Sequence, residues 1–173
     1  NIPEYLSSNL TLLLKELEII RNKKFNEEEL IRLFNKYGIY LVIEDALNGT
    51  KIRGCTMVKN NNPCIYITRY FKEKASFYFT LYHEIGHIKS DYNKLKNKIM
   101  VNNEETSEKE MDNFALNQMI PDNIWNNVKI DPLEKEKICK DNNIPLCFLY
   151  SRLAYEGIIS YKSKEYNNHK EVI

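Results

Sequence analysis

The sequence lacks the features that would direct it to a membrane or to a strongly charged partner. Its longest apolar stretches, at 10–14 and 77–81, fall far short of the ~18 uninterrupted residues of a membrane span, and no charged-then-apolar leader opens it. Charge of one sign is not in excess either, because 25 Lys+Arg against 24 Asp+Glu leave a net charge of +1. We therefore expect no membrane association and no direct nucleic acid binding by this portion.

The sequence has few cysteines, and their spacing does not form pairs. The four cysteines, at 55, 64, 139 and 147, include no C-x-x-C pair. This excludes a small disulfide-rich secreted scaffold and favours a reducing, cytoplasmic compartment. The chain opens with Asn1 rather than Met, so we expect a fragment or a processed product, and an upstream module is left open.

What the sequence does contain is enough apolar surface for one core. Of 173 residues, 43% are hydrophobic, which excludes a disordered or fibrous chain. Helical periodicity and end signals predict helices near 6–20, 27–37, 75–90, 107–120, 132–141 and 146–156. β-branched and aromatic runs predict strands near 39–43, 52–58 and 64–67, the last two joined by a turn at 60–63.

These elements predict an α+β fold, with helices packed around a small, mostly antiparallel three-stranded sheet. We expect N-terminal helices at 1–38 that pack on the core, a main domain at 39–161, and a polar, loosely held tail at 162–173. His169 lies in that tail and is expected to be solvated. No internal repeat or low-complexity linker interrupts the chain.

Two of the three histidines lie in His83-Glu84-Ile85-Gly86-His87, which has the H-E-x-x-H spacing. Residues four apart share one helix face, so both imidazoles can reach a single zinc ion. Glu84 lies about 100° round the helix and can act as general base beside the ion, which lowers the pKa of a bound water to ~7. The implied reaction is amide hydrolysis. The alternative is that both histidines are ordinary helix residues.

A catalytic zinc ion needs a third protein ligand and an open fourth position. In the helix predicted from Ser107, Glu108 faces the same direction as the apolar Met111, Ala115 and Met119, whereas Glu110 points about 200° away. A buried carboxylate requires a cation or strong donors, so Glu108 is the candidate ligand. The alternative is an exposed first-turn residue that complements the helix dipole.

Other acidic residues are weaker candidates. Ser107 and Glu110 have the spacing of a capping box, which would occupy Glu110 at the helix start. Glu104 and Glu105 precede the helix in a predicted loop. Asp91 continues the histidine stripe but lies about 12 Å along the axis from His83, too far for a third ligand on one straight helix.

Asp112 lies one turn after Glu108 and on the same side of the helix. It could accept the free ring N–H of a ligating histidine and so orient the ring, although a surface role explains it nearly as well. Cys55 or Cys64 could in principle occupy the open zinc position, but small buried strand residues are the default interpretation. Tyr82 and Tyr92 are among twelve tyrosines that could stabilise an oxyanion, and the sequence selects none of them.

At these residues the chain resembles the ImmA/IrrE family of zinc metallopeptidases. The resemblance covers about 30–160 and rests on the stretch 79–87, on Glu108-x-x-x-Asp112-x-Phe114-Ala115, and on Met119-Ile120-Pro121. It implies a zincin-like metallopeptidase domain at 39–161. The strands near 49–54 and 63–67 also resemble the version of this domain that follows a helix-turn-helix in antitoxin-like repressors.

The resemblance also implies a ligand set, with His83, His87 and Glu108 on zinc, as in thermolysin-like enzymes, and Glu84 as the catalytic base. Two positions depart from the family pattern. Asp91 stands where many members have another histidine, and Met111 stands where alanine is usual, which affects packing only.

The function implied is that of a cytoplasmic zinc endopeptidase that cleaves one regulatory protein, such as a helix-turn-helix repressor of a mobile element or stress response. An exposed edge of the small sheet could bind the substrate in extended form. The alternative is a zinc-binding regulatory or sensor module of an antitoxin-like transcription regulator, without peptidase activity. Replacement of Glu84 by Gln separates the two hypotheses.

Overall fold

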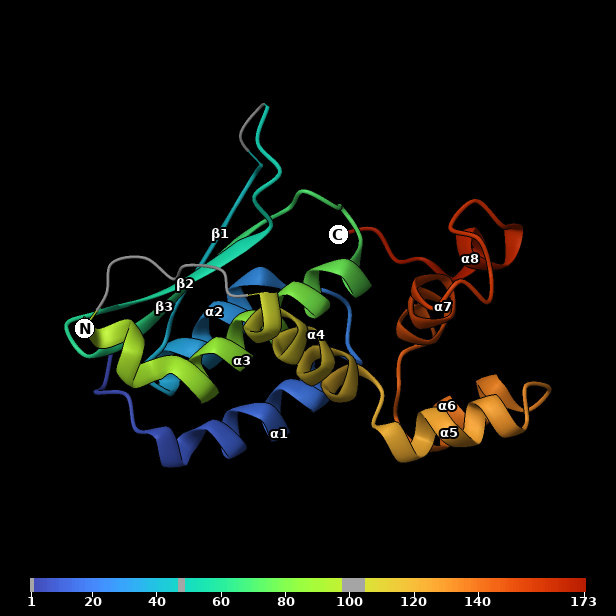
Figure 1. The fold of residues 1–173 in the computed structure, drawn as a ribbon, viewed down its shortest axis with the longest axis horizontal. Coiled ribbons are helices and arrows are strands. Elements are labelled where there is room, and N and C mark those ends of the chain that lie inside the picture. The colour runs from blue at the N-terminus through green and yellow to red at the C-terminus, as the bar shows by residue number, and fades with distance from the viewer. Residues whose placement is uncertain (1, 47–48, 98–104) are drawn as a thin grey trace.

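The computed structural model describes residues 2–46, 49–97 and 105–173, in which helices pack around one small sheet, so the predicted α+β class is confirmed (Figure 1). The helices of these segments are α1 (Leu10–Ile20), α2 (Glu27–Lys36), α3 (Lys74–Asn97), α4 (Glu105–Met119), α5 (Asp122–Ile130), α6 (Lys135–Asp141), α7 (Leu146–Tyr155) and α8 (Lys164–His169). The strands are β1 (Tyr40–Glu44), β2 (Gly54–Lys59) and β3 (Asn62–Thr68). None of the helices in these segments combines the length and the hydropathy that a membrane span requires.

The sheet is mixed, which corrects the expectation of a mostly antiparallel one. Its order is β1-β3-β2, with β1 parallel and β2 antiparallel to the central strand β3. The β2–β3 hairpin turns at Asn60 and Asn61, both with positive φ. Asn62, at the start of β3, donates through Nδ2 to the carbonyl of Gly38, 2.7 Å away, just before β1. Because β1 and β3 therefore start at the same end of the sheet, they run in the same direction.

One face of the sheet packs on α3. The alternation along β3 turns Ile65 and Ile67 into the core, and Leu41 of β1 joins them. From α3, the fully buried Leu81 and Ile85 pack into the same core, and both β2 and β3 contact this helix. The H-E-x-x-H motif is thus carried by a helix that the sheet covers and holds in place.

The N-terminal helices form as the sequence predicts and pack into the same core. Asn26 caps α2 by accepting a hydrogen bond from the backbone N–H of Glu29 at 3.0 Å. Gly38 follows α2 with a φ of +76°, and a Cβ at this position would lie 2.8 Å from the carbonyl oxygen of Pro3. Glycine is therefore required here both by conformation and by space.

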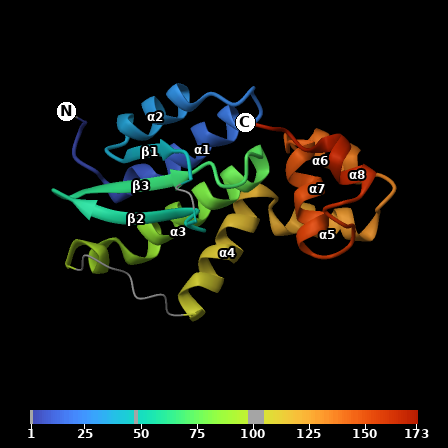
Figure 2. The same cartoon turned by 90° about the horizontal axis from the view of Figure 1, so that it is seen from above.

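The remaining helices, α5–α8, form a cluster at one end of the molecule, beyond α4 (Figures 1 and 2). Helix α5 begins directly after Pro121 and buries Trp125 and Val128, and the sequence pattern did not predict it. Pro121 follows the end of α4 and is also the N-cap residue of α5. A proline after a predicted helix indicates that the helix ends, but it does not indicate that another helix begins.

The prediction of a loosely held tail is wrong. Segment 162–173 contains α8, whose Tyr166 is buried, and Val172 then forms a β-bridge with Glu73 just before α3. His169 is not simply solvated either, because its ring stacks on Tyr150 at a centroid distance of 3.8 Å. The end of the chain is thereby tied to the start of the helix that carries the motif.

Candidate metal centre

The H-E-x-x-H residues lie in the middle of α3, a helix of 24 residues, far from its fraying ends. His83 and His87 lie one turn apart on one face, and their Nε2 atoms are 3.3 Å from each other. Glu84 and His87 are 5% and 6% exposed, so the motif is largely screened from solvent. The helical spacing alone brings the two imidazoles together.

Glu108 of α4 completes a group of three. Its Oε2 lies 3.2 Å from His83 Nε2, and its Oε1 lies 3.5 Å from His87 Nε2. Atoms bonded to a tetrahedral zinc ion at ~2.0–2.1 Å lie roughly 3.3–3.4 Å apart, close to all three separations. Among the described residues, these three are the only His, Cys, Asp or Glu side chains grouped closely enough to hold a metal ion.

The other ring nitrogen of each histidine faces a carboxylate. His83 Nδ1 lies 2.8 Å from Asp112 Oδ1, and because an ionised carboxylate only accepts, Nδ1 carries the hydrogen. His87 Nδ1 lies 3.6 Å from Asp91 Oδ2 and is buried without a hydrogen-bond partner among the described atoms. Each carboxylate favours hydrogen on Nδ1, which leaves both Nε2 lone pairs directed at Glu108. A cation between these three atoms would relieve the mutual repulsion of lone pairs and carboxylate, so the residues fit a metal ion.

Sequence reasoning assigned Asp91 no role beyond a rejected ligand. The structure places it on the outer side of His87, where Lys94 Nζ also binds its Oδ1 at 2.9 Å. The signal was present in the spacing, since Asp91 lies one helical turn after His87. Asp91 is too far along the helix from His83 to bind the same ion. From that position it can still lie next to Nδ1 of His87, the ring nitrogen that faces away from the metal site.

The other acidic candidates do not join the group. Glu110 is exposed, as its angle predicts. However, α4 begins at Glu105, two residues before the predicted start, so position 107 lies inside the helix and not at its N-cap. Glu104 lies outside the described residues, as does the side chain of Glu105. The side chain of Glu108 is 32% exposed. Its exposure therefore lies between that of the buried ligand and that of the exposed first-turn residue, the two alternatives that the sequence left open.

A second group of contacts, which the sequence did not reveal, holds the carboxylate of Glu84. Thr56 of β2 donates through Oγ1 to Glu84 Oε2 at 2.7 Å. Gly54, two residues earlier on the same face of β2, leaves the space for the other oxygen, because a Cβ there would lie 2.7 Å from Glu84 Oε1. The alternation of β2 indicates which residues share a face, but only the packing of β2 on α3 places them against Glu84.

Burial and hydrogen bonding shift the protonation equilibria in this centre. Burial raises the pKa of the Glu84 carboxyl, although the Thr56 hydrogen bond and the neighbouring imidazoles act in the opposite direction. Burial by itself lowers the pKa of His83, but the hydrogen bond with Asp112 and the charges of nearby carboxylates outweigh it, so the pKa is raised. Glu84 therefore has the higher proton affinity that suits a general base.

Close packing of α3 on α4 sets the position of Glu108. Gly86 lies within the motif, and a Cβ there would be 2.7 Å from Met111 Sδ and 3.2 Å from the Phe114 ring. The absence of a side chain at Gly86 thus lets α4 approach α3 at the level of the two histidines. Met111 is buried in this contact.

The cysteines and tyrosines that the sequence left open lie outside the ligand group. Cys55 is exposed and Cys64 partly exposed, contrary to the expectation of buried strand residues. Tyr82 is buried and its hydroxyl lies 3.5 Å from Arg21 Nη1 in the core. Tyr92 donates its hydroxyl hydrogen to the carbonyl of Asn61. Neither phenol is bonded to the group of His83, His87 and Glu108.

Comparison with known proteins found no family model, no curated protein and no solved structure that matches this chain.

Proposed function

We propose that this protein is a zinc-dependent endopeptidase that cleaves a specific regulatory protein. The observation that carries the proposal is the mutual spacing of His83 Nε2, His87 Nε2 and Glu108, 3.2–3.5 Å, next to a buried carboxylate that is not one of the three. Structural zinc sites use four protein ligands, whereas catalytic sites use three and keep one position open. Three ligands beside a held carboxylate support catalysis.

The chain's own residues have distinct tasks in this proposal. A bound zinc ion would supply a water that ionises near neutral pH and would polarise the scissile carbonyl. Glu84 accepts a proton at Oε1, the oxygen that Thr56 does not hold, and later donates it to the leaving amine. The hydrogen bond with Asp112 holds the His83 imidazole in the tautomer that binds metal, and the charge of Asp91, 3.6 Å from His87 Nδ1, favours the same tautomer of His87.

The position of the sheet edge next to Glu84 favours a substrate that binds in extended form. β2 is an edge strand of the described sheet, and the same strand carries Gly54 and Thr56 against Glu84. A substrate segment that pairs with this edge would pass the general base with its backbone extended. The resemblance to the ImmA/IrrE family favours a helix-turn-helix repressor as the protein substrate.

The replacement Glu84→Gln tests the proposal. We expect one zinc ion per chain in both proteins and a loss of cleavage of about 10²–10⁴-fold in the variant, because the amide cannot accept the proton. Metal is measured by mass spectrometry, and cleavage is measured on helix-turn-helix repressors and a peptide library. Glu110→Gln makes the same chemical change at an exposed site of α4 and should leave both quantities unchanged.

Two results would contradict the proposal. If the wild-type protein holds zinc and cleaves none of these substrates, the non-catalytic regulatory module becomes the better explanation. If Glu84→Gln cleaves as fast as the wild type, Glu84 is not the base.

A further inference from the structure

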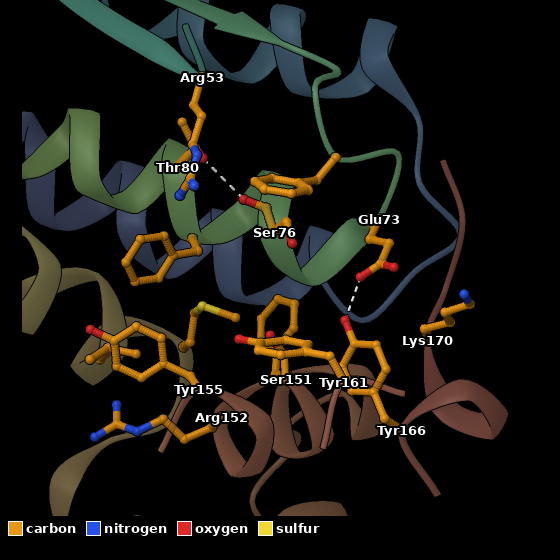
Figure 3. Close-up of a pocket in the computed structure, with 15 residues that line it drawn as sticks. Arg53, Glu73, Ser76, Thr80, Ser151, Arg152, Tyr155, Tyr161, Tyr166 and Lys170 are labelled. Atoms are coloured by element: carbon orange, nitrogen blue, oxygen red, sulfur yellow. Dashed lines mark hydrogen bonds between the residues drawn. The ribbon is translucent and has the colours of Figure 1, made fainter. Parts of the chain in front are cut away.

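A cavity of about 550 Å³ lies beside the part of α3 that precedes the H-E-x-x-H motif, and its lining does not include His83, His87 or Glu108 (Figure 3). Its walls come from α3, α4, α7 and the segment around α8, so it forms between the core and the C-terminal cluster. The lining is mainly apolar and aromatic, with Phe79, Met119, Phe148, Tyr155 and Tyr161 among its residues. Its size falls within the ~300–1,000 Å³ range of ligand pockets.

The cavity and the metal-ligand group share α3. Phe79 lines the cavity one turn before His83, and the centroids of the two rings are 6.4 Å apart. Thr80 lines it one turn before Glu84. The cavity also reaches the start of β2, because Arg53, the residue before this strand, lines it, and Gly54 lies next to both Thr80 and Glu84.

Most charged groups in the lining have partners or lie at the exposed rim. Glu73 accepts a hydrogen bond from Tyr166, as Figure 3 shows. Arg152 binds Glu156 through Nε at 2.6 Å and its guanidinium lies 5.1 Å from the Trp125 ring centroid, although its buried Nη1 has no hydrogen-bond partner among the described atoms. Arg53 is exposed and stacks over the ring of Phe71 at 4.7 Å, and Lys170 is exposed as well. The interior therefore offers mainly aromatic faces, aliphatic groups and hydroxyls, which suit an uncharged bulky side chain.

We propose that this cavity is the specificity pocket of the enzyme, and that it receives a large aromatic or aliphatic side chain of the substrate close to the scissile bond. The proposal rests on the proposed function. A substrate segment paired with β2 passes Glu84 and reaches the cavity at Arg53 and Thr80, so a side chain within a few residues of the cleaved bond enters it. The pocket selects the substrate by burial of apolar surface rather than by charge.

The variant Ser151→Phe fills the cavity from α7 without contact with the metal ligands, and Ser151→Ala is the matched control that removes only the hydroxyl (Figure 3). Cleavage-site profiling on a peptide library should show that Ser151→Phe lowers kcat/KM for peptides with Phe or Leu near the cleaved bond by about tenfold or more. Peptides with Ala or Gly there should be affected least. The zinc content of both variants should equal that of the wild type.

A binding measurement separates this proposal from the proposed function. N-acetyl-phenylalaninamide, added to metal-free wild-type protein, should shift the NMR resonances of cavity residues such as Phe79 and Tyr155, and Ser151→Phe should abolish those shifts. Shifts without any peptide cleavage would support an apolar binding pocket and count against the protease. Cleavage that is indifferent to side-chain size in both wild type and Ser151→Phe would overturn the pocket.

If Ser151→Phe does not fold, Ser76→Leu fills the cavity from α3 and makes the same predictions. Folding of each variant is checked by thermal unfolding before the assays. Resonance shifts from the probe that fall outside the cavity, or no shifts at all, would also overturn the proposal.

Discussion

Replacement of Gly54 by Ala should uncouple turnover from metal binding. The Cβ of an alanine at this position would lie 2.7 Å from Glu84 Oε1 and 2.8 Å from Thr80 Cγ2. To reach an ordinary contact distance, the carboxylate must retreat by roughly 0.7 Å, and a misplacement of about 1 Å near the reacting atoms can cost ~10²-fold in rate. We therefore expect kcat to fall about 10- to 100-fold.

The same variant should keep its metal and most of its stability. The nearest atoms to the added methyl group belong to Glu84 and Thr80, not to the three candidate ligands. Overpacking against Thr80 costs about 1–3 kcal/mol, and the lower conformational entropy of unfolded alanine offsets about 0.5–1 kcal/mol of it. The free energy of unfolding should thus fall by at most about 2.5 kcal/mol.

Kinetics on the best repressor or peptide substrate, zinc stoichiometry and urea unfolding together test this prediction. Met57→Ala is the control, since Met57 lies on the same strand with a largely exposed side chain. An unchanged kcat in Gly54→Ala would refute the idea that β2 positions the general base. A loss of activity that merely follows a loss of zinc would refute it as well.

Two further substitutions test the outer contacts of the centre and the frame that supports it. Asp112→Asn should weaken zinc affinity about 10- to 100-fold in a chelator competition, because the amide holds His83 less firmly than the carboxylate does. The control Asp122→Asn, at an exposed position, should leave zinc affinity unchanged. Equal zinc affinities in the two variants would contradict the contact between Asp112 and His83. Gly38→Ala should lower the free energy of unfolding by about 2–4 kcal/mol, because the left-handed backbone strains an alanine and the added Cβ overlaps backbone atoms. Gly157 also has a positive φ but no atom within 4 Å of the added Cβ, so Gly157→Ala should lower the free energy of unfolding by only about 1–2 kcal/mol. Urea unfolding measures both, and equal losses would show that the overlap at Gly38 has no cost.

Local rules predicted much of the secondary structure. The cap at Asn26 and the glycine at 38 bound α2 as expected, and the three strands lie where the β-branched runs predict them. The omission of α5 has a physical reason: its stabilisation comes from Trp125 and Val128, which are buried only because the C-terminal helices pack there. The tail was misjudged for the same reason, because its own composition is polar and its order comes from distant partners such as Glu73.

The direction of pairing between β1 and β3 also lay beyond the sequence. Strand propensity is a property of short runs of residues. The direction in which β1 pairs with β3 depends instead on where the chain leaves α2 relative to the turn between β2 and β3. The hydrogen bond between Asn62 and Gly38 holds the starts of β1 and β3 together, and it joins residues 24 apart.

The sequence by itself determined the part of the centre that one helix can encode. Histidines four residues apart on α3 share a face in any α-helix, with Glu84 offset by a fixed angle, and the angular argument singled out Glu108 on the next helix. Only the tertiary structure decided the rest: the approach of α4 at Gly86, the hold of Thr56 on Glu84, the place of Asp91 and the cavity beside α3. Helical geometry is local and repeats from one turn to the next, whereas these contacts join separate elements and exist only when the whole core has packed.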